Sequence, residues 1–399
     1  MGLDRGALAH RLRSRPFWTL VGIRAAFLLG TALTLLWQRP VGGAVDRDLR
    51  FEEFHAYDGR TDLLFNVFTQ WDAGWYLNIA ANGYGGEQAA AFFPLYPLVV
   101  HAVAWVTRSL VVAGVLVSLV AAGIAAELLW RIARQLLGER AAGDSVLYLA
   151  TWPVAFVFTS VYAEGLFVAL AAGSVLAALR QRSLLAAGLA TLAVATRLIG
   201  LALLPALAVL LWPRVRRLVP LLLVPVPVVL FAWHLERRLG DWQDFYEAQS
   251  AFWLRHTPTL GPLGGLWDAF WEAKNGALQV LLHLPRHGEI AENDMFGARN
   301  ALHFLLLLAC IWLTWVAWTR LGPAFGLYSA AYLAIVLSSP VEFFPLVSLP
   351  RFVLGDFPLF LALAAVLEDR PRARSLVLYS FVAIGGAAAV GFSRHAWIA

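Results

Sequence analysis

Long apolar runs dominate the chain and alternate with short polar segments. A helix needs about 20 apolar residues to cross a hydrocarbon core ~30 Å thick, whereas barrel strands show only a period-two alternation. The pattern therefore predicts an all-α polytopic membrane protein with nine full spans. We place these spans at about residues 17–37, 110–129, 145–160, 162–179, 220–233, 302–318, 323–337, 352–367 and 376–392.

Two further apolar stretches do not fit simple spans. Residues 92–106 are too few and contain two prolines, and a full crossing would move the arginines of 131–140 to the wrong side, so a half-helix or interfacial piece is favoured. Residues 184–212 are basic at both ends. They predict a re-entrant hairpin of two short helices with Arg197 near its tip, where such a turn must line a cavity.

Charge placement gives an orientation. Arginines precede the first apolar run, which predicts a cytoplasmic N-terminus, and that run lacks the cleavage site of a removed signal peptide. The acidic loops at about 38–91 and 236–299 then lie outside. The prediction puts Glu87 and Asn275 outside and Arg140, Arg216 and Arg372 inside. Residues 1–399 form a single integral membrane domain in this interpretation, in a bacterial plasma membrane.

Composition narrows the class further. The chain is 60% hydrophobic and 14% charged, with a mean hydropathy of +0.67. Its net charge of +5 comes from arginine clusters between apolar runs, so we predict membrane lipids as partners and no nucleic acid. A single cysteine, Cys310, excludes a disulfide within the chain. Histidine spacing matches no metal motif, and we predict no metal and no cofactor.

The candidate chemistry is concentrated in residues 71–97, WDAGWYLNIAANGYGGEQAAAFFPLYP. Asp72 lies between Trp71 and Trp75, and an acidic residue, Glu87, follows. Aromatic rings stack on sugar C–H faces while a carboxylate accepts a hydroxyl proton, so this composition suits carbohydrate chemistry. An interfacial aromatic belt with a solvated acid, or with Asp72 as a helix cap, is the structural alternative.

The order of these residues resembles the signature of the PIG-V family, mannosyltransferases of the GT-C superfamily that add the second mannose of GPI anchors, together with their bacterial relatives. The matching positions are Trp71, Asp72, Tyr76, Ile79, Ala80, Gly83, Tyr84, Glu87, Ala91, Phe92, Phe93, Pro94, Leu95 and Pro97. Bacteria make no GPI anchors, so a bacterial member implies another acceptor.

Three later segments resemble further family elements. SVYAEGLF supplies Tyr162 and Glu164, with Gly165 where the family has serine; ATRLIGL supplies Arg197; and LPRFVLGDFPLF supplies Arg351. Each charge has a structural alternative. Glu164 could pair with Arg197, and Arg351 could pair with Glu164, Glu342 or Asp356.

The resemblance implies a GT-C bundle with two large outer loops. It implies an inverting, metal-independent transfer of mannose from polyprenyl-phosphate-mannose to a glycolipid or glycan acceptor on the outer membrane face. Asp72 would be the catalytic base, and Arg197 and Arg351 would bind the donor phosphate. The implied substrate-binding residues are Trp71, Trp75, Tyr76, Glu87, Tyr162 and Glu164. A transporter or flippase of lipid-linked sugars is the alternative function.

Overall fold

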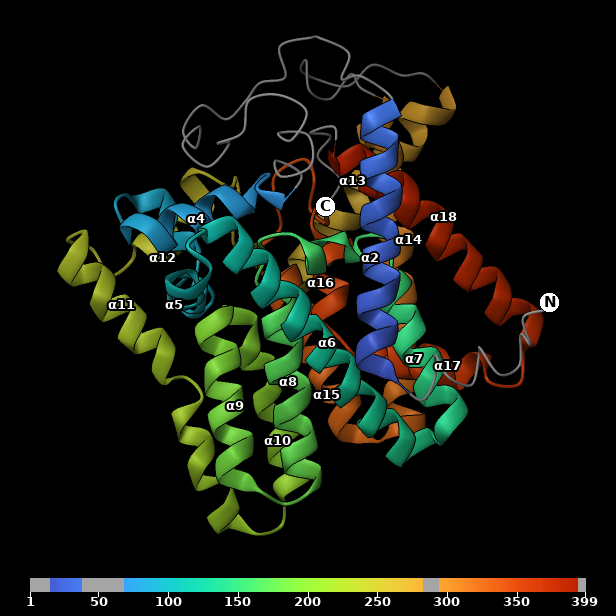
Figure 1. The fold of residues 1–399 in the computed structure, drawn as a ribbon, viewed down its shortest axis with the longest axis horizontal. Helices are drawn as coiled ribbons and strands as arrows, with labels where there is room; N and C mark the ends of the chain where they lie inside the picture. The colour runs from blue at the N-terminus through green and yellow to red at the C-terminus, as the bar shows by residue number, and fades with distance from the viewer. Residues whose placement is uncertain (1–14, 38–67, 283–293, 394–399) are drawn as a thin grey trace.

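The computed structural model describes residues 15–37, 68–282 and 294–393. Within these ranges the chain folds into helices joined by short connections (Figure 1). An isolated bridge between Arg255 and Val341 is the only β-type pairing in these ranges. The predicted all-α class is confirmed. The first part of the predicted outer loop, at 38–67, and the stretch 283–293 of the second loop lie outside the described residues.

Most of the described residues belong to helices, which follow one another in chain order. The α-helices are α2 (Pro16–Trp37), α4 (Asp72–Asn82), α5 (Leu95–Thr107), α6 (Leu110–Leu137), α7 (Glu139–Thr151), α8 (Glu164–Leu179), α9 (Ser183–Thr196), α10 (Leu203–Leu211), α11 (Val226–Arg238), α12 (Asp244–Ala251), α13 (Pro262–Leu282), α14 (Asp294–Val316), α15 (Pro323–Leu337), α16 (Leu349–Gly355), α17 (Pro358–Leu367) and α18 (Pro371–Ser393). The short helices are η3 (Glu87–Ala91), η4 (Ala155–Thr159), η5 (Leu198–Ala202), η6 (Val215–Arg217), η7 (Val219–Leu223) and the π-helical η9 (Ala317–Leu321).

Several helices have the length and composition of membrane spans. Four continuous stretches in the described ranges pass this test, or five if one bent pair counts as a single span. They are Leu110–Leu137, Val215–Arg238, Phe296–Leu321 and Pro371–Phe392, with α16 and α17 as the bent pair. The remaining apolar segments are shorter helices, including Pro16–Thr31 and α15. The chain is thus an integral membrane protein, and the number of nine full spans stays a prediction.

The two short helices of the predicted hairpin are present, and its re-entrant placement in the membrane stays a prediction. Helix α9 ends at Thr196, Arg197 is extended (φ −157°, ψ 134°), and η5 and α10 lead back along α8 and α9 (Figure 1). Gly200 allows the chain to fold back, because a Cβ there would lie 2.7 Å from the backbone nitrogen of Val194. The turn therefore places Arg197 between the end of α9 and the start of η5.

Helix α5 has 13 residues, which corresponds to about 20 Å and is shorter than the ~30 Å core. It is followed at once by α6, whose N-cap Ser109 accepts a hydrogen bond from the backbone nitrogen of Val112 at 3.3 Å. This length agrees with the half-helix or interfacial piece predicted for residues 92–106, and its placement in the membrane stays a prediction.

Two predicted spans are wrong in detail because proline interrupts them. The run 145–160 is not one helix, since α7 ends at Thr151 and Pro153 follows before η4. The run 352–367 is divided into α16 and α17, which are bent by 87°. Pro358 begins α17 and restricts the backbone before it, so a straight helix cannot continue through this point.

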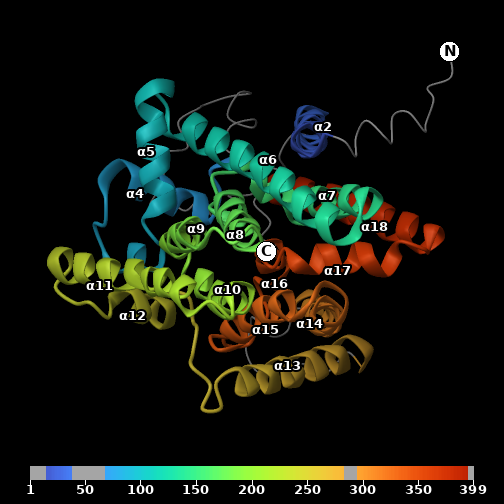
Figure 2. The same cartoon turned by 90° about the horizontal axis from the view of Figure 1, so that it is seen from below.

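Helix α8 lies at the centre of the bundle, with α6 and α9 packed on it (Figures 1 and 2). Position 165 carries glycine where the PIG-V pattern has serine. A Cβ at this position would lie 2.6 Å from the carbonyl oxygen of Ser118 on α6, so a larger residue does not fit. The close approach of α6 thus requires glycine beside Glu164. It also holds the first turn of α8 in place.

The connection between α11 and α14, predicted as an outer loop, contains two helices. Helix α12 packs on η3, and α13 lies beside α14 at the edge of the molecule (Figure 2). Helix α13 carries exposed Trp267 and Trp271 and is absent from the membrane-span candidates. This connection therefore presents aromatic surface outside the apolar bundle.

Candidate functional site

Asp72 begins α4 and is half-buried. The preceding Trp71 adopts a left-handed φ of 60°, which is costly for a bulky residue and common at functional sites. Arg351, on α16, donates from Nη1 to Oδ2 of Asp72 at 2.5 Å, and the two side chains are only 12% and 18% exposed. Two segments 279 residues apart thus share one ion pair.

Glu164 links Arg351 to a second arginine. Arg197 donates from Nη1 to Oε1 of Glu164, and Nε of Arg351 lies 3.4 Å from the same oxygen. We call Asp72, Glu164, Arg197 and Arg351 the charge cluster. The two structural pairings considered for Glu164 from the sequence, with Arg197 and with Arg351, are both present. Of the other acids considered for Arg351, Asp356 instead accepts a hydrogen bond from Ser329 at 2.5 Å.

The helix arrangement explains why these charges meet. Asp72 and Glu164 are each the first residue of a helix, where the macrodipole and unpaired N–H groups favour negative charge. Arg197 directly follows α9, which runs antiparallel to α8, so it reaches the first turn of α8. Buried charges require such partners, because an isolated one would cost several kcal/mol.

Arg255 is a third arginine at this site, and the sequence interpretation missed it. It lies between α12 and α13, 5.8 Å from the ring centre of Phe352, with its Nη1 donating to the carbonyl oxygen of Ser339 at 2.6 Å. Burial, followed by the charge of Arg351, lowers its pKa to about 10. It forms no ion pair with any described residue. The signal available in the sequence was an arginine beside Phe252 and Trp253 in a loop expected to lie outside the membrane.

Aromatic rings surround the guanidinium groups. The guanidinium carbon of Arg351 lies 5.6 Å from the ring centre of Tyr162, and that of Arg197 lies 5.3 Å from Phe352. Tyr162 also donates from its hydroxyl to the carbonyl oxygen of Gln70 at 3.2 Å. Tyr162 therefore connects the segment before Asp72 to the arginines, as well as being a predicted substrate contact.

The other predicted aromatic residues occupy different environments. Trp71 is 45% exposed, whereas Tyr76 is buried edge-on against Phe92. Trp75 is half-buried and stacks on Phe92 at 6.0 Å. Among these residues Trp71 offers the most ring surface to a ligand, while Tyr76 packs within the motif.

Glu87 does not join the charge cluster in the described contacts. It is exposed on η3, near α12, where its charge contributes to a raised pKa of Asp244; burial of Asp244 is the larger cause and Asp241 the next. Asp241, Asp244 and Glu247 each offer an oxygen within 4.8 Å of the others, so this acidic group could hold a cation. It is not part of the charge cluster.

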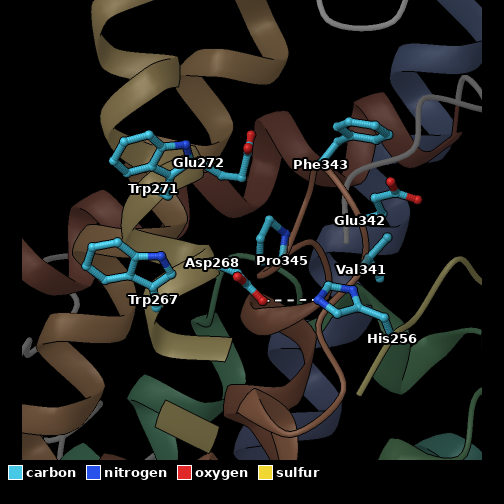
Figure 3. Close-up of a pocket in the computed structure, with 9 residues that line it drawn as sticks. All are labelled: His256, Trp267, Asp268, Trp271, Glu272, Val341, Glu342, Phe343 and Pro345. Carbon is cyan, nitrogen blue, oxygen red and sulfur yellow. Dashed lines mark hydrogen bonds and ion pairs between the residues drawn. The ribbon is translucent and has the colours of Figure 1, made fainter. Parts of the chain in front are cut away.

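A cavity of about 310 Å³ lies between α13 and the segment 341–345 (Figure 3). Trp267 and Trp271 stack along α13 with ring centres 6.0 Å apart. His256 pairs through Nε2 with Oδ2 of Asp268 at 3.0 Å. We call this cavity the tryptophan pocket, lined by His256, Trp267, Asp268, Trp271, Glu272, Val341, Glu342, Phe343 and Pro345.

The fold resembles that of a membrane protein of known structure, ArnT. The crystal structure of ArnT from Cupriavidus metallidurans bound to undecaprenyl phosphate superposes with a TM-score of 0.50 at 14% identity, covering 89% of this chain and 77% of that one. The apo structure of the same protein gives a TM-score of 0.46 at 15% identity, covering 81% and 70%. No curated protein sequence matches.

The family resemblance is confirmed independently of the fold. Residues 52–212 match the family model described as mannosyltransferase (PIG-V). This range includes Asp72, Glu164 and Arg197, while Arg351 lies beyond it. Residues 52–212 are thus similar in sequence to the PIG-V mannosyltransferases, and the described residues share the fold of ArnT.

Proposed function

We propose that the protein transfers mannose from a polyprenyl-phosphate-mannose donor to a glycolipid or glycan acceptor, with inversion and without a metal. The observation that carries this proposal is the excess of arginine at the buried site. The site contains three guanidinium groups and two carboxylates. The guanidinium groups belong to Arg197, Arg255 and Arg351, and the carboxylates to Asp72 and Glu164. One positive charge is left over, which suits a phosphate ester.

Arg255 is the best-placed group for this excess charge. Its lowered pKa reflects a desolvated cation that forms no ion pair with a described carboxylate, so an incoming anion would stabilise it. Arg197 and Arg351 already bind carboxylates, but a guanidinium has five N–H donors and can hold a second anion. The ligand of the ArnT crystal structure, undecaprenyl phosphate, supports a lipid phosphate as that anion.

The chemistry requires one proton acceptor and a stabilised leaving group. In the proposed step Asp72 accepts the proton of the acceptor hydroxyl, and the hydroxyl oxygen forms a bond to the anomeric carbon. The bond from that carbon to the phosphate oxygen breaks on the opposite face, and polyprenyl phosphate leaves with the electron pair. The arginines stabilise the charge on the departing phosphate in place of a metal.

A reconstitution assay tests this function. The full chain in nanodiscs, supplied with radiolabelled polyprenyl-phosphate-mannose and a panel of alkyl glycosides, should release polyprenyl phosphate and form a mannosylated product. Movement of intact lipid-linked sugar between leaflets without product would favour the flippase alternative. The configuration of the new glycosidic bond, determined by NMR, tests inversion.

The side of the membrane is a separate part of the proposal. Cysteines placed at Glu87 and Asn275 in a Cys310→Ser background should react with an impermeant maleimide from outside whole cells. Cysteines at Arg140, Arg216 and Arg372 should react only after permeabilisation. External labelling at Arg140 would show that residues 92–106 cross the membrane and would overturn the orientation.

A further inference from the structure

The tryptophan pocket lies directly beside the charge cluster, separated by one backbone seam. The seam joins residues 254–256 to 339–342: the backbone nitrogen of His256 donates to Pro340 at 3.0 Å, and that of Glu342 donates to Leu254 at 2.9 Å. Arg255, within the seam, reaches Phe352 on the side of the cluster, whereas its neighbour His256 lines the pocket. Successive residues of an extended segment point to opposite faces, which explains the division.

One wall of the pocket is an exposed aromatic surface. Trp267 and Trp271 are four residues apart on α13, so they share a helix face, and their rings lie nearly parallel at 21°. They are 61% and 45% exposed. Contact between large apolar rings and water is unfavourable, so a ligand that covers the rings is stabilised. Together the two rings provide a flat apolar surface for stacking.

The remaining polar groups are carboxylates and one imidazole. Asp268 and Glu272 extend from α13 toward the segment that carries Glu342 (Figure 3). Carboxylates accept hydrogen bonds from hydroxyl or ammonium groups but repel phosphate. The pocket is therefore opposite in charge character to the arginine-rich cluster. It is unsuited to the phosphate of the donor.

Phe343 forms part of the opposite wall and has a left-handed φ of 63°. This conformation is strained for an aromatic residue, and such strain is found mainly where a loop is held in place for binding. Figure 3 shows Phe343 across the pocket from α13. The cavity volume lies at the lower end of the range for small-molecule sites, which suits a monosaccharide unit.

We infer that the tryptophan pocket binds a pyranose unit of the acceptor that is uncharged or carries an amino group. Trp267 and Trp271 stack on its C–H face, and Asp268, Glu272 and Glu342 accept hydrogen bonds from its hydroxyl or amino groups. The pocket holds the acceptor beside the seam that separates it from Asp72. The role of this sugar as the acceptor rests on the proposed function. Binding of a sugar to the pocket can be measured whether or not the protein transfers mannose.

The first test measures sugar binding alone. Saturation-transfer NMR on the full chain in nanodiscs would use octyl α-mannoside, octyl β-glucosaminide and octyl β-glucuronide as probes. We expect saturable binding of at least one of the first two and none of the anionic glucuronide. Trp271→Ala should weaken binding by about three- to tenfold, the effect of losing one stacking contact. Trp271→Phe should restore part of it.

A matched control uses Trp315→Ala on α14, because Trp315 is similarly exposed (65%) but does not line the pocket. Equal losses in Trp271→Ala and Trp315→Ala would indicate a general interfacial role for tryptophan and overturn the proposal. Lack of saturable binding of all three probes to the unmodified chain would also overturn it.

The second test separates the pocket from the transfer reaction. In the transfer assay Trp271→Ala and Trp267→Ala should raise the acceptor KM about three- to tenfold while the donor KM stays within experimental error. If the chain transfers no mannose but Trp271→Ala still weakens glycoside binding, the sugar site stands and the proposed function fails. If transfer proceeds and neither variant changes the acceptor KM, the pocket assignment fails alone.

Discussion

The charge cluster and the tryptophan pocket both combine carboxylates with aromatic rings, yet they differ in burial. The ion pairs of the cluster involve side chains that are 4% to 18% exposed, and they join four separate segments. The His256–Asp268 pair of the pocket is 45% and 32% exposed and joins a loop to the adjacent helix. Interactions in the cluster are therefore strong and structurally coupled, whereas those in the pocket are weak and local.

This difference indicates how the two regions can change. Removal of one member of the cluster leaves an opposite charge unpaired in the interior, so chemistry and folding are linked there. The pocket tolerates substitution because water and local rearrangement compensate for lost contacts. Under the proposed function, acceptor selectivity can then vary in the pocket while donor binding at the charge cluster is kept.

The largest expected effect is that of Asp72→Asn. The change keeps side-chain volume but removes the proton acceptor, so the transfer rate should fall by about 10²- to 10⁴-fold. Donor binding, measured with radiolabelled lipid, should persist because the arginines remain. Turnover near the unmodified rate would remove Asp72 from the role of base.

Glu164→Gln should chiefly affect folding. Arg197 loses its charged partner and Arg351 loses one of its two, and breaking a buried pair typically costs about 3–5 kcal/mol. The thermal unfolding midpoint in detergent should fall clearly, together with the yield of folded protein. A stable Glu164→Gln chain with reduced turnover would instead assign Glu164 to substrate binding.

Arg197→Lys and Arg255→Lys compare a paired arginine with one that lacks a carboxylate. Lysine keeps the charge but not the planar fork, so each change should raise the donor dissociation constant by about tenfold. Arg255→Lys should leave the unfolding midpoint nearly unchanged, because no carboxylate is left behind. If Arg197→Lys lowers stability while donor binding is unaffected, Arg197 is the structural partner of Glu164 and the phosphate belongs to the other two arginines.

The smallest effect on stability is expected for Asp268→Asn. The partly exposed pair with His256 contributes about 0–1 kcal/mol, so the unfolding midpoint should scarcely move. The same change should weaken glycoside binding, measured by saturation-transfer NMR, since one hydrogen-bond acceptor becomes an amide. A drop in stability as large as that of Glu164→Gln would show that the pocket is part of the folded core.

The sequence alone predicts the helical membrane class, the turn at Arg197 and four of the five charges at the site, but not Arg255. These features depend on local properties: apolar length, proline position and the cost of charge in hydrocarbon, all of which can be judged from neighbouring residues. The motif order also identified the family that residues 52–212 match. Glu87 shows the limit of this reasoning, because its place in the motif did not bring it to the charge cluster.

The pairing of the charges and their neighbours depends on contacts between segments far apart in the sequence. Arg351 meets Asp72 across 279 residues, and Arg255 reaches the cluster through a bridge to Val341. The bend between α16 and α17 and the pairing of loops 254–256 and 339–342 also depend on packing between distant segments. Such contacts depend on how whole helices pack against one another, so no local sequence pattern encodes them. The tryptophan pocket is an example, because it forms between α13 and the distant segment 341–345.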